Sequence, residues 1–262
     1  MTPSMTLGPQ ILRKRRIDHA SEPYRAAGKF AYHFARRKLG NDPVFVGMLE
    51  RGLFPINARI VDLGCGQGLL AAWLLSARHL YDSGDWSAEW PAPPRVADIC
   101  GVDLLTKDVK RAQLALGGRA RFEEGDMRHV DFGQADVVVM MDTVHYVDGP
   151  SQDDILRWVR AALVPNGLFL TRVGDAGAGM RFRLSNWIDR TVAFFRGNGQ
   201  PCLHCRRLPD WIRALEALGF RVETAPINGD LPFANVMLVA RLGEKAGQGC
   251  GSGQCQTSDI PS

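Results

Sequence analysis

Three glycines, Gly64, Gly66 and Gly68, alternate with other residues directly after the apolar stretch 60–63 and before an apolar run suited to a helix. Glycine lets the main chain turn sharply and lets another group approach it closely. Backbone amides at the start of a helix favour polar or anionic groups. The spacing therefore predicts a ligand-binding turn between a strand and a helix. A tight turn without a ligand would have the same spacing.

The sequence of this turn excludes two common phosphate-binding motifs. Dinucleotide-binding folds carry G-x-G-x-x-G, but the residue three positions after Gly66 is Leu69. A P-loop carries Lys followed by Ser or Thr, and neither pair follows the glycines. The pattern is instead D-x-G-x-G-x-G, and it begins at Asp62.

Two further acids stand at the ends of later apolar stretches. Asp103 ends "ICGVD", and Asp126 follows "RFEEG". A carboxylate can accept hydrogen bonds from two hydroxyl groups at once, which suits a ligand that carries such a pair. A lone acid after a strand is also a common helix cap. Because both acids fall at strand ends, ligand contacts are the favoured interpretation.

Alternating strands and helices must position these residues. The expected strands cover 59–64, 97–105, 119–126, 135–142 and 168–174. The helices expected between and after them cover 68–77, 106–116 and 151–167. Such alternation predicts right-handed βαβ units around a mostly parallel sheet. The remaining expected elements are helices over 21–40, 42–53, 181–197 and 208–220 and a closing strand pair over 221–227 and 234–242.

The glycine pattern and the strands after it closely resemble the class I S-adenosylmethionine-dependent methyltransferases, over roughly residues 20–240. The resemblance implies an α/β, Rossmann-like class I methyltransferase fold. That fold has a mostly parallel seven-stranded sheet with helices on both faces, here with an N-terminal helical cap. It also implies an enzyme whose cofactor is S-adenosyl-L-methionine.

The resemblance assigns the methionine part and the ribose of the cofactor to the glycine turn. On that basis Gly64, Cys65 and Gly66 line the cofactor, and Asp62 orders the turn or faces the methionine amine. Asp103 would accept the ribose hydroxyls. The family's ribose acid usually comes sooner after the glycines, and here a loop rich in proline and tryptophan delays it.

The adenine contacts implied by the resemblance come from the next two strand ends. Leu104 would pack on the adenine face. Asp126 would take the adenine amino group, and the backbone amide of Met127 would meet a ring nitrogen.

In this family the segment after the fourth strand runs beside the donated methyl. Here that segment is "MMDTVHYVDG", which makes Asp142 and His145 the catalytic candidates, with Tyr146 beside them. Either Asp142 or His145 would transfer a proton, or His145 would only shape the pocket. Asp142 lacks a convincing second and third carboxylate, so no metal is expected.

The six cysteines do not change that expectation. Cys202 and Cys205 form one C-x-x-C, while Cys250 and Cys255 lie in a Gly/Ser-rich tail. Two C-x-x-C pairs would be a strong zinc signal, but one pair with a C-x4-C is weak. Reduced thiols are the favoured interpretation.

The chain divides into three expected parts. Residues 1–20 are a flexible basic N-terminus, residues 21–243 form one methyltransferase domain, and residues 244–262 are a disordered tail. Within the domain, 21–55 form the helical cap and 175–207 a substrate lid.

Composition points to a cytoplasmic protein. The formal net charge is +4, 45% of residues are hydrophobic and 23% are charged. No apolar run approaches the ~18 residues of a membrane span, and the N-terminus lacks a secretory signal. No membrane partner is expected, and this mild charge does not require nucleic acid.

The expected function is S-adenosylmethionine-dependent methyl transfer to a small-molecule acceptor, either free or bound to a carrier protein. The layout also resembles the methyltransferase-like proteins of bacterial aryl-polyene pathways, which implies C-methylation of a phenolic head group. One alternative is an RNA or protein methyltransferase, since "RKRR" at 13–16 could meet phosphates. Against it, the D/N-P-P-Y/F signature is replaced by "DTVH" at 142–145. Another is a non-catalytic nucleoside-binding protein of the same fold.

Overall fold

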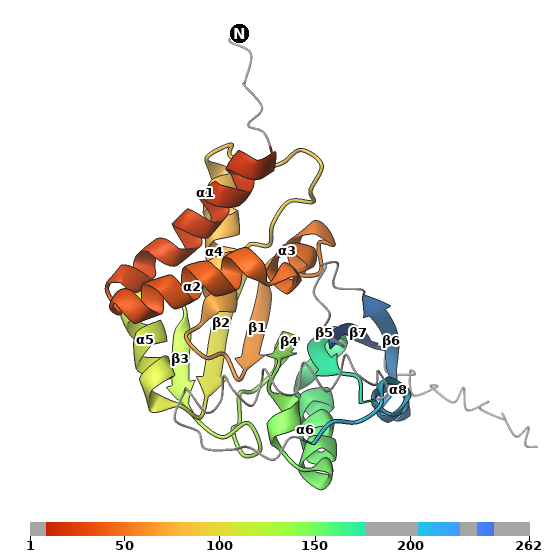
Figure 1. Ribbon diagram of the computed structural model, residues 1–262. Coiled ribbons are helices and arrows are strands. Elements are labelled where there is room, and N and C mark those ends of the chain that lie inside the picture. The colour runs from red at the N-terminus through yellow and green to blue at the C-terminus, as the bar shows by residue number, and fades with distance from the viewer. Residues whose placement is uncertain (1–8, 177–203, 226–234, 244–262) are drawn as a thin grey trace, which may run out of the picture.

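The computed structural model describes residues 9–176, 204–225 and 235–243, and its centre is a seven-stranded sheet (Figure 1). The strand order is β3-β2-β1-β4-β5-β7-β6. The first five strands pair in parallel, and β7 runs antiparallel to β5 and β6. The strands are β1 Ala58–Leu63, β2 Val96–Asp103, β3 Arg121–Glu124, β4 Ala135–Met141, β5 Leu163–Gly174, β6 Phe220–Ala225 and β7 Asn235–Leu242. The predicted fold class and the closing strand pair are confirmed.

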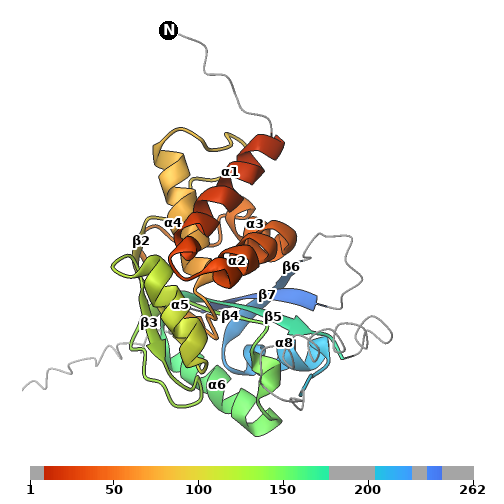
Figure 2. The ribbon, with the colours of Figure 1, turned by 60° about the vertical axis from the view of Figure 1, so that its left-hand side comes forward.

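Helices cover both faces of this sheet (Figure 2). The N-terminal helices lie with α4 on one side, and α6 and α8 lie on the other. The helical elements are α1 Pro9–Ser21, η1 Glu22–Arg25, α2 Lys29–Asn41, α3 Pro43–Glu50, α4 Leu69–Asp82, α5 Thr106–Leu116, η2 Val144–Tyr146, α6 Gly149–Ala162 and α8 Leu208–Ala217.

Two hydrophobic cores lie on the two faces of the sheet. Side chains alternate between the faces along a strand. In β1, Ile60 joins the core under α4, whereas Val61 and Leu63 join the core under α6 and α8. Because both faces are covered, the central strands are apolar almost throughout, as β4 shows in "ADVVVMM".

The N-terminal region differs from the expectation. Residues 9–21 form α1 rather than a flexible arm, and Leu12, Arg16 and Ala20 on one side of it are buried. The single helix expected over 21–40 is interrupted at Gly28, whose φ of 100° is left-handed. The cap therefore consists of α1, η1, α2 and α3.

Arg16 is buried because the tryptophan-rich loop after α4 covers it. Its guanidinium lies 3.8 Å from the ring centroid of Trp90, a cation–π contact. Burial lowers the pKa of Arg16 to about 10. Arg15 forms an ion pair with Asp85 of the same loop at 2.6 Å. The loop that delays Asp103 in the sequence thus holds α1 in place.

Some expectations fall on residues outside those described. The helix expected over 181–197 and the tail 244–262 lie there, as does most of the expected lid 175–207. Within the described residues, no helix is both long enough and apolar enough to span a membrane.

Candidate active site

The candidate site lies at the carboxyl ends of the parallel strands, next to β1. There β1 pairs with β2 on one side and with β4 on the other, so the strand order reverses. Open α/β sheets bind ligands in the crevice at such a switch point. The glycine turn follows β1 directly, and the predicted acids follow the neighbouring strands.

Each of the three glycines in the turn has a left-handed φ. The values are 74° at Gly64, 54° at Gly66 and 73° at Gly68. The amides of Gly64 and Cys65 both donate to the carbonyl of Val102 in β2, at 2.8 and 3.1 Å. The turn is thereby fixed against the second strand before it enters α4.

The glycines differ in what a side chain would meet. A Cβ on Gly64 would lie 2.2 Å from Thr143 Cγ2, and one on Gly68 would lie 2.6 Å from Phe122 Cε1. At Gly66, nothing lies within 4 Å of that position. The sequence interpretation attributed all three glycines to a ligand. In the structure, the protein's own side chains fill two of these positions, and Gly66 leaves its main chain open.

Asp103 lies at the end of β2, facing this turn. Its Oδ2 accepts from the Gly66 amide at 2.8 Å, and its Oδ1 accepts from the Leu105 amide at 2.9 Å. Both carboxylate oxygens of Asp103 are thereby oriented toward the main chain of this edge. The adjacent Leu104 is 65% exposed, which makes it an apolar platform at the same edge.

Asp62 is buried beneath the turn. Burial, followed by repulsion from Asp103, raises the pKa of Asp62 to about 7. A buried acid of this kind favours a cationic partner, because the cation compensates for the lost hydration of the carboxylate. The methionine amine of the implied cofactor is such a cation.

Asp126 follows β3, and its carboxylate is hydrogen-bonded to Arg128. Its Oδ1 accepts from the Arg128 amide at 2.9 Å, and the Arg128 guanidinium contacts both of its oxygens. These bonds to Arg128 lower the pKa of Asp126. Met127 between them is partly buried against the second core. The structure thus brings Asp126 to the expected edge, already paired with a cation.

Asp142 belongs to a cluster of four charges. Arg172 of β5 donates to both oxygens of Asp42, at 2.6 and 2.8 Å, and its Nε donates to Asp142 Oδ1 at 2.6 Å. Lys38 of α2 lies 2.8 Å from Asp42 and 3.5 Å from Asp142. This charge cluster, formed by Lys38, Asp42, Asp142 and Arg172, joins the N-terminal cap to the ends of β4 and β5.

The cluster keeps Asp142 ionised. Burial alone would raise the pKa of Asp142, but the charges of Arg172 and Lys38 hold it well below its usual value. The backbone of Asp142 has a left-handed φ of 57°, so the turn that follows is sharply bent. Sequence analysis missed Arg172 and Asp42. The signal was a charged residue inside the otherwise apolar stretch "LFLTRVG".

His145 lies in η2, three residues after Asp142. Its ring is buried and lies 4.4 Å from the Tyr146 ring, measured between centroids. Burial lowers the pKa of His145, so the imidazole is neutral near pH 7. No described residue bonds to its Nε2. The structure therefore offers a neutral, unpaired ring nitrogen beside the charge cluster.

Tyr24 supports the turn from the cap. Its hydroxyl donates to the carbonyl oxygen of Gln67 at 2.8 Å, and the whole side chain is buried. Tyr24 packs in the core and fixes the glycine turn, while Phe30 of α2 stays 58% exposed.

Metal ligands do not gather among the described residues, where no group of three or more His, Cys, Asp or Glu could hold an ion. Cys65 and Cys100 are free thiols, and Cys202 lies outside the described residues.

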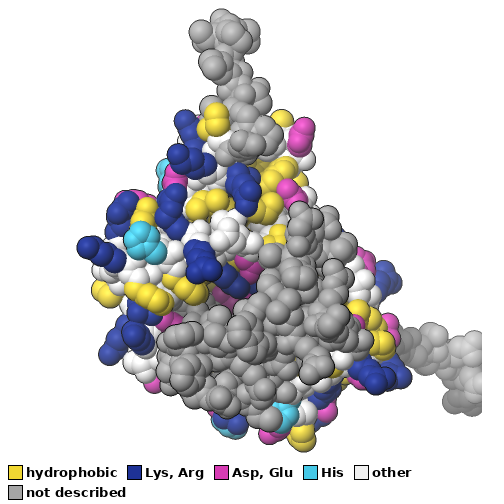
Figure 3. All heavy atoms as spheres, in the orientation of Figure 1, with side chains coloured by type: hydrophobic (Ala, Val, Ile, Leu, Met, Phe, Trp, Pro, Cys, Tyr) yellow, Lys and Arg dark blue, Asp and Glu magenta, His cyan; other side chains and the backbone are white. Residues whose placement is uncertain are grey.

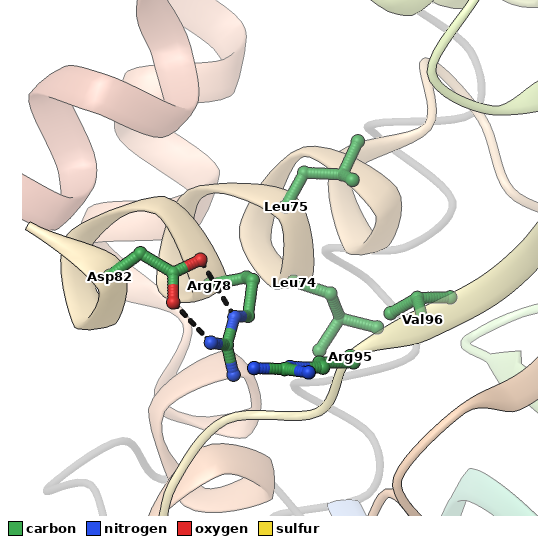
Figure 4. A pocket seen from close by; sticks show the side chains of 6 residues that line it. All are labelled: Leu74, Leu75, Arg78, Asp82, Arg95 and Val96. Carbon is green, nitrogen blue, oxygen red and sulfur yellow. Dashed lines mark hydrogen bonds and ion pairs between the residues drawn. The ribbon is translucent and has the colours of Figure 1, made fainter.

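A groove of about 330 Å³ lies away from the site, at the amino end of β2 where Val96 begins the strand (Figure 4). Arg78 and Asp82 pair within it, with Nε donating to Oδ2 at 2.8 Å. It therefore belongs to the opposite end of the sheet from the candidate site.

The comparisons with known proteins agree with this geometry. A family model described as a methyltransferase domain matches residues 24–225. The chain therefore belongs to this methyltransferase family, and its fold is that of the class I enzymes that use S-adenosylmethionine. The predictions of the family, of an enzyme and of this cofactor are confirmed.

Individual relatives are distant. Carboxy-S-adenosyl-L-methionine synthase of Chromohalobacter salexigens is 29% identical over 130 residues, which are 48% of this chain and 43% of that protein. The match thus spans less than half of the curated relative.

Solved structures share the fold over most of the chain. Human N-acetylserotonin methyltransferase in complex with SAM has a TM-score of 0.56 and 17% identity, covering 90% of this chain and 60% of that one. Magnesium protoporphyrin IX methyltransferase from Synechocystis, with bound SAH, has a TM-score of 0.54 and 17% identity, covering 90% and 100%.

Proposed function

We propose that this methyltransferase acts on a small-molecule acceptor with a phenolic or other aromatic group, which binds beside His145 and Tyr146. The observation that carries the proposal is the buried Nε2 of His145, which forms no hydrogen bond with any described residue. A recessed imidazole suits a small acceptor group that can enter the site. The two neighbouring structures named above are called after small molecules, N-acetylserotonin and magnesium protoporphyrin IX.

The cofactor side consists of residues that fit S-adenosylmethionine. Gly66 leaves open space over its main chain, and the carboxylate of Asp103 at the same turn would accept hydrogen bonds from the ribose hydroxyls. Asp62 would take the methionine amine, and the exposed Leu104 would support the adenine. When bound, the cofactor supplies an electrophilic methyl group on a positively charged sulfur. The residues of the turn contribute by orientation, an effect of up to ~7–11 kcal/mol in well-oriented reactions.

On the acceptor side, His145 is the better base of the two candidates. A general base must be unprotonated at the working pH, and the lowered pKa of His145 keeps its ring neutral. His145 Nε2 would accept the proton of an acceptor hydroxyl. Asp142 is held by Arg172 on both oxygens, so its proposed role is to fix the segment that carries His145.

The basic run near the N-terminus favours a small-molecule acceptor over an RNA acceptor. Lys and Arg lie over the N-terminal helices with hydrophobic and acidic side chains between them (Figure 3). Within "RKRR", Arg16 is buried against Trp90, and Arg15 pairs with Asp85. Arg13 donates to the carbonyl oxygen of Gly40, so three of the four charges have partners within the protein. RNA that shifts in a gel at low salt, with a steep loss at higher salt, would favour the RNA alternative.

The test has two stages. Calorimetry with S-adenosylmethionine should show binding, and NAD should not bind. A screen of phenolic acceptors is then followed by mass spectrometry for S-adenosylhomocysteine. His145→Ala should lower turnover about 10²–10⁴-fold with little change in cofactor affinity.

Two results would contradict the proposal. Equal loss of turnover and of cofactor affinity in His145→Ala would make His145 a structural residue. Detection of a carboxylated cofactor in place of S-adenosylhomocysteine would instead assign the activity named for the curated relative.

A further inference from the structure

Gln152 occupies a position where an apolar residue is expected. It lies on α6, and with Ile155, Leu156 and Val159 it forms the buried stripe of that helix. These positions follow the spacing i, i+3, i+4 and i+7, which marks the core side of an amphipathic helix. Gln152 is 0% exposed. Burying an amide is costly unless it forms hydrogen bonds, so its polar group requires a local explanation.

The side-chain nitrogen of Gln152 faces three backbone carbonyls. Its Nε2 donates to the carbonyl oxygens of Val144 at 3.2 Å, Val147 at 3.0 Å and His204 at 2.7 Å. An amide nitrogen carries two hydrogens, so at least one of them is shared between two acceptors. Three converging carbonyls also fix the orientation of the amide, because its oxygen would be repelled at that place.

Two of these carbonyls bracket His145. Val144 precedes it, and Val147 follows it by two residues. The carbonyl of His145 itself accepts from the His204 amide at 2.9 Å. His204 in turn accepts from Gln152, so the bonds form one connected unit around η2.

We propose that Gln152 is a positioning residue that holds η2 between α6 and residue 204 and so sets the place of the His145 ring. The charge cluster anchors the same segment at its start through Asp142, and Gln152 anchors it at its end. The inference rests on the proposed role of His145 at the acceptor side. It adds a residue that does not touch cofactor or acceptor.

Two substitutions separate positioning from simple packing. Gln152→Met keeps the length of the side chain and removes both donors. Gln152→Glu is isosteric but is repelled by the three carbonyls when ionised, and it can donate one hydrogen when protonated. Val159→Ala, two turns along the same buried stripe, is the matched control for lost stability.

The first readout needs no acceptor. The NMR signals of the His145 ring, assigned with His145→Gln, are titrated in the free protein and with S-adenosylhomocysteine. Gln152→Met should shift the His145 titration by at least about half a pH unit, because the ring moves relative to its buried surroundings. Val159→Ala should leave it in place. An unchanged titration in Gln152→Met would overturn the proposal.

The second readout uses the acceptor found in the phenolic screen. Gln152→Met should lower kcat about tenfold or more, with cofactor affinity within about twofold. The kcat of Gln152→Glu, taken as a fraction of the unmodified protein's kcat at the same pH, should rise as the pH falls, since the protonated Glu donates again. A loss of kcat no greater than that of Val159→Ala would overturn the proposal.

The two readouts also separate this inference from the proposed function. If His145→Ala retains full turnover, the role of His145 as a base fails. The NMR titration would still decide whether Gln152 sets the position of the ring.

Discussion

The side chain of Thr143 occupies the space that a Cβ on Gly64 would need. That Cβ would lie 2.2 Å from Thr143 Cγ2, and Thr143 Oγ1 donates to the Leu63 carbonyl at 3.3 Å. The turn after β1 and the segment after β4 are therefore packed directly against each other. The proposed cofactor side and the proposed acceptor side of the site would share this contact.

Gly64→Ala and Gly66→Ala should therefore fail in different ways. Both place a side chain at a left-handed φ, a strain of roughly 1–2 kcal/mol. Gly64→Ala adds a clash with Thr143, so it should lower the melting temperature more, as measured by calorimetry. Gly66→Ala should mainly lower the affinity for S-adenosylmethionine, because the added methyl group fills the open space over the turn.

Thr143→Ala provides the control for this comparison. It removes two of the three Thr143 atoms nearest to the Gly64 position, Cγ2 and Oγ1. Combined with Gly64→Ala, it should restore part of the lost stability. Equal melting temperatures for the two single glycine variants would contradict the assignment.

Asp103 should be the main acid for cofactor affinity. Asp103→Ala loses the acceptors of the Gly66 and Leu105 amides together with those expected for the ribose. Titration calorimetry should show that it lowers the affinity for S-adenosylmethionine at least about tenfold, or ~1.4 kcal/mol. Asp103→Asn keeps one acceptor oxygen, so its affinity for S-adenosylmethionine should lie between those of the unmodified protein and Asp103→Ala. Asp98→Asn, in the same strand but paired with Arg121, should bind normally. Unchanged affinity in Asp103→Ala would remove Asp103 from the site.

Asp62 should make cofactor affinity depend on pH. Its pKa of about 7 means that the carboxyl is largely protonated at pH 6 and ionised at pH 8. If the ionised form takes the methionine amine, affinity for S-adenosylmethionine should rise between these values, by up to about tenfold per pH unit below the pKa. Asp62→Asn should abolish this rise. A flat affinity profile in the unmodified protein would contradict it.

The raised pKa of Asp62 should also make the stability of the cofactor-free protein depend on pH. This stability should fall as the pH rises, whereas the affinity for the cofactor should increase. The pKa of Asp62 in the folded protein lies above that of an ordinary aspartate, so the folded state binds the proton more tightly than the unfolded state. The contribution of Asp62 to stability is full below about pH 4 and is lost as the pH rises to about 7. Asp62→Asn should therefore melt higher than the unmodified protein at pH 8, while binding the cofactor less well.

The sequence predicts the parts of the site that depend on local pattern. The turn 64–68, the acids at the ends of β1, β2 and β3, and the order of strands and helices all follow from hydrophobic period and glycine spacing. These signals lie within a few residues of each other. The assigned ligand roles of Asp62, Asp103 and Asp126 stay predictions.

The parts that were missed depend on residues far apart in the chain. Arg172 meets Asp42 across 130 residues and Asp142 across 30, so no local pattern marks the charge cluster. Arg16 lies within a basic run that suggests solvent exposure, and its burial requires Trp90 from a later loop. For the same reason, the sequence could not show that Thr143 and Phe122 fill the spaces beside two of the glycines.

The charge cluster yields the last prediction, because its central cation is buried between two carboxylates. Arg172 is 6% exposed, and its loss would leave Asp42 and Asp142 facing each other with only Lys38, which is partly exposed, as their counter-charge. Breaking a buried pair from one side costs roughly 3–5 kcal/mol, so Arg172→Met should lower the melting temperature by on the order of 10 °C. Arg213→Met, which breaks an exposed pair with Asp210, should change it little. Removing the two carboxylate charges as well, in Arg172→Met with Asp42→Asn and Asp142→Asn, should recover part of the lost stability. Replacing all members of a buried ion pair costs far less than removing one partner.

Thermal unfolding followed by circular dichroism measures all of these variants. A triple variant that melts lower than Arg172→Met alone would show that the two carboxylates have other partners, and that the cap is not held to β4 and β5 by this cluster.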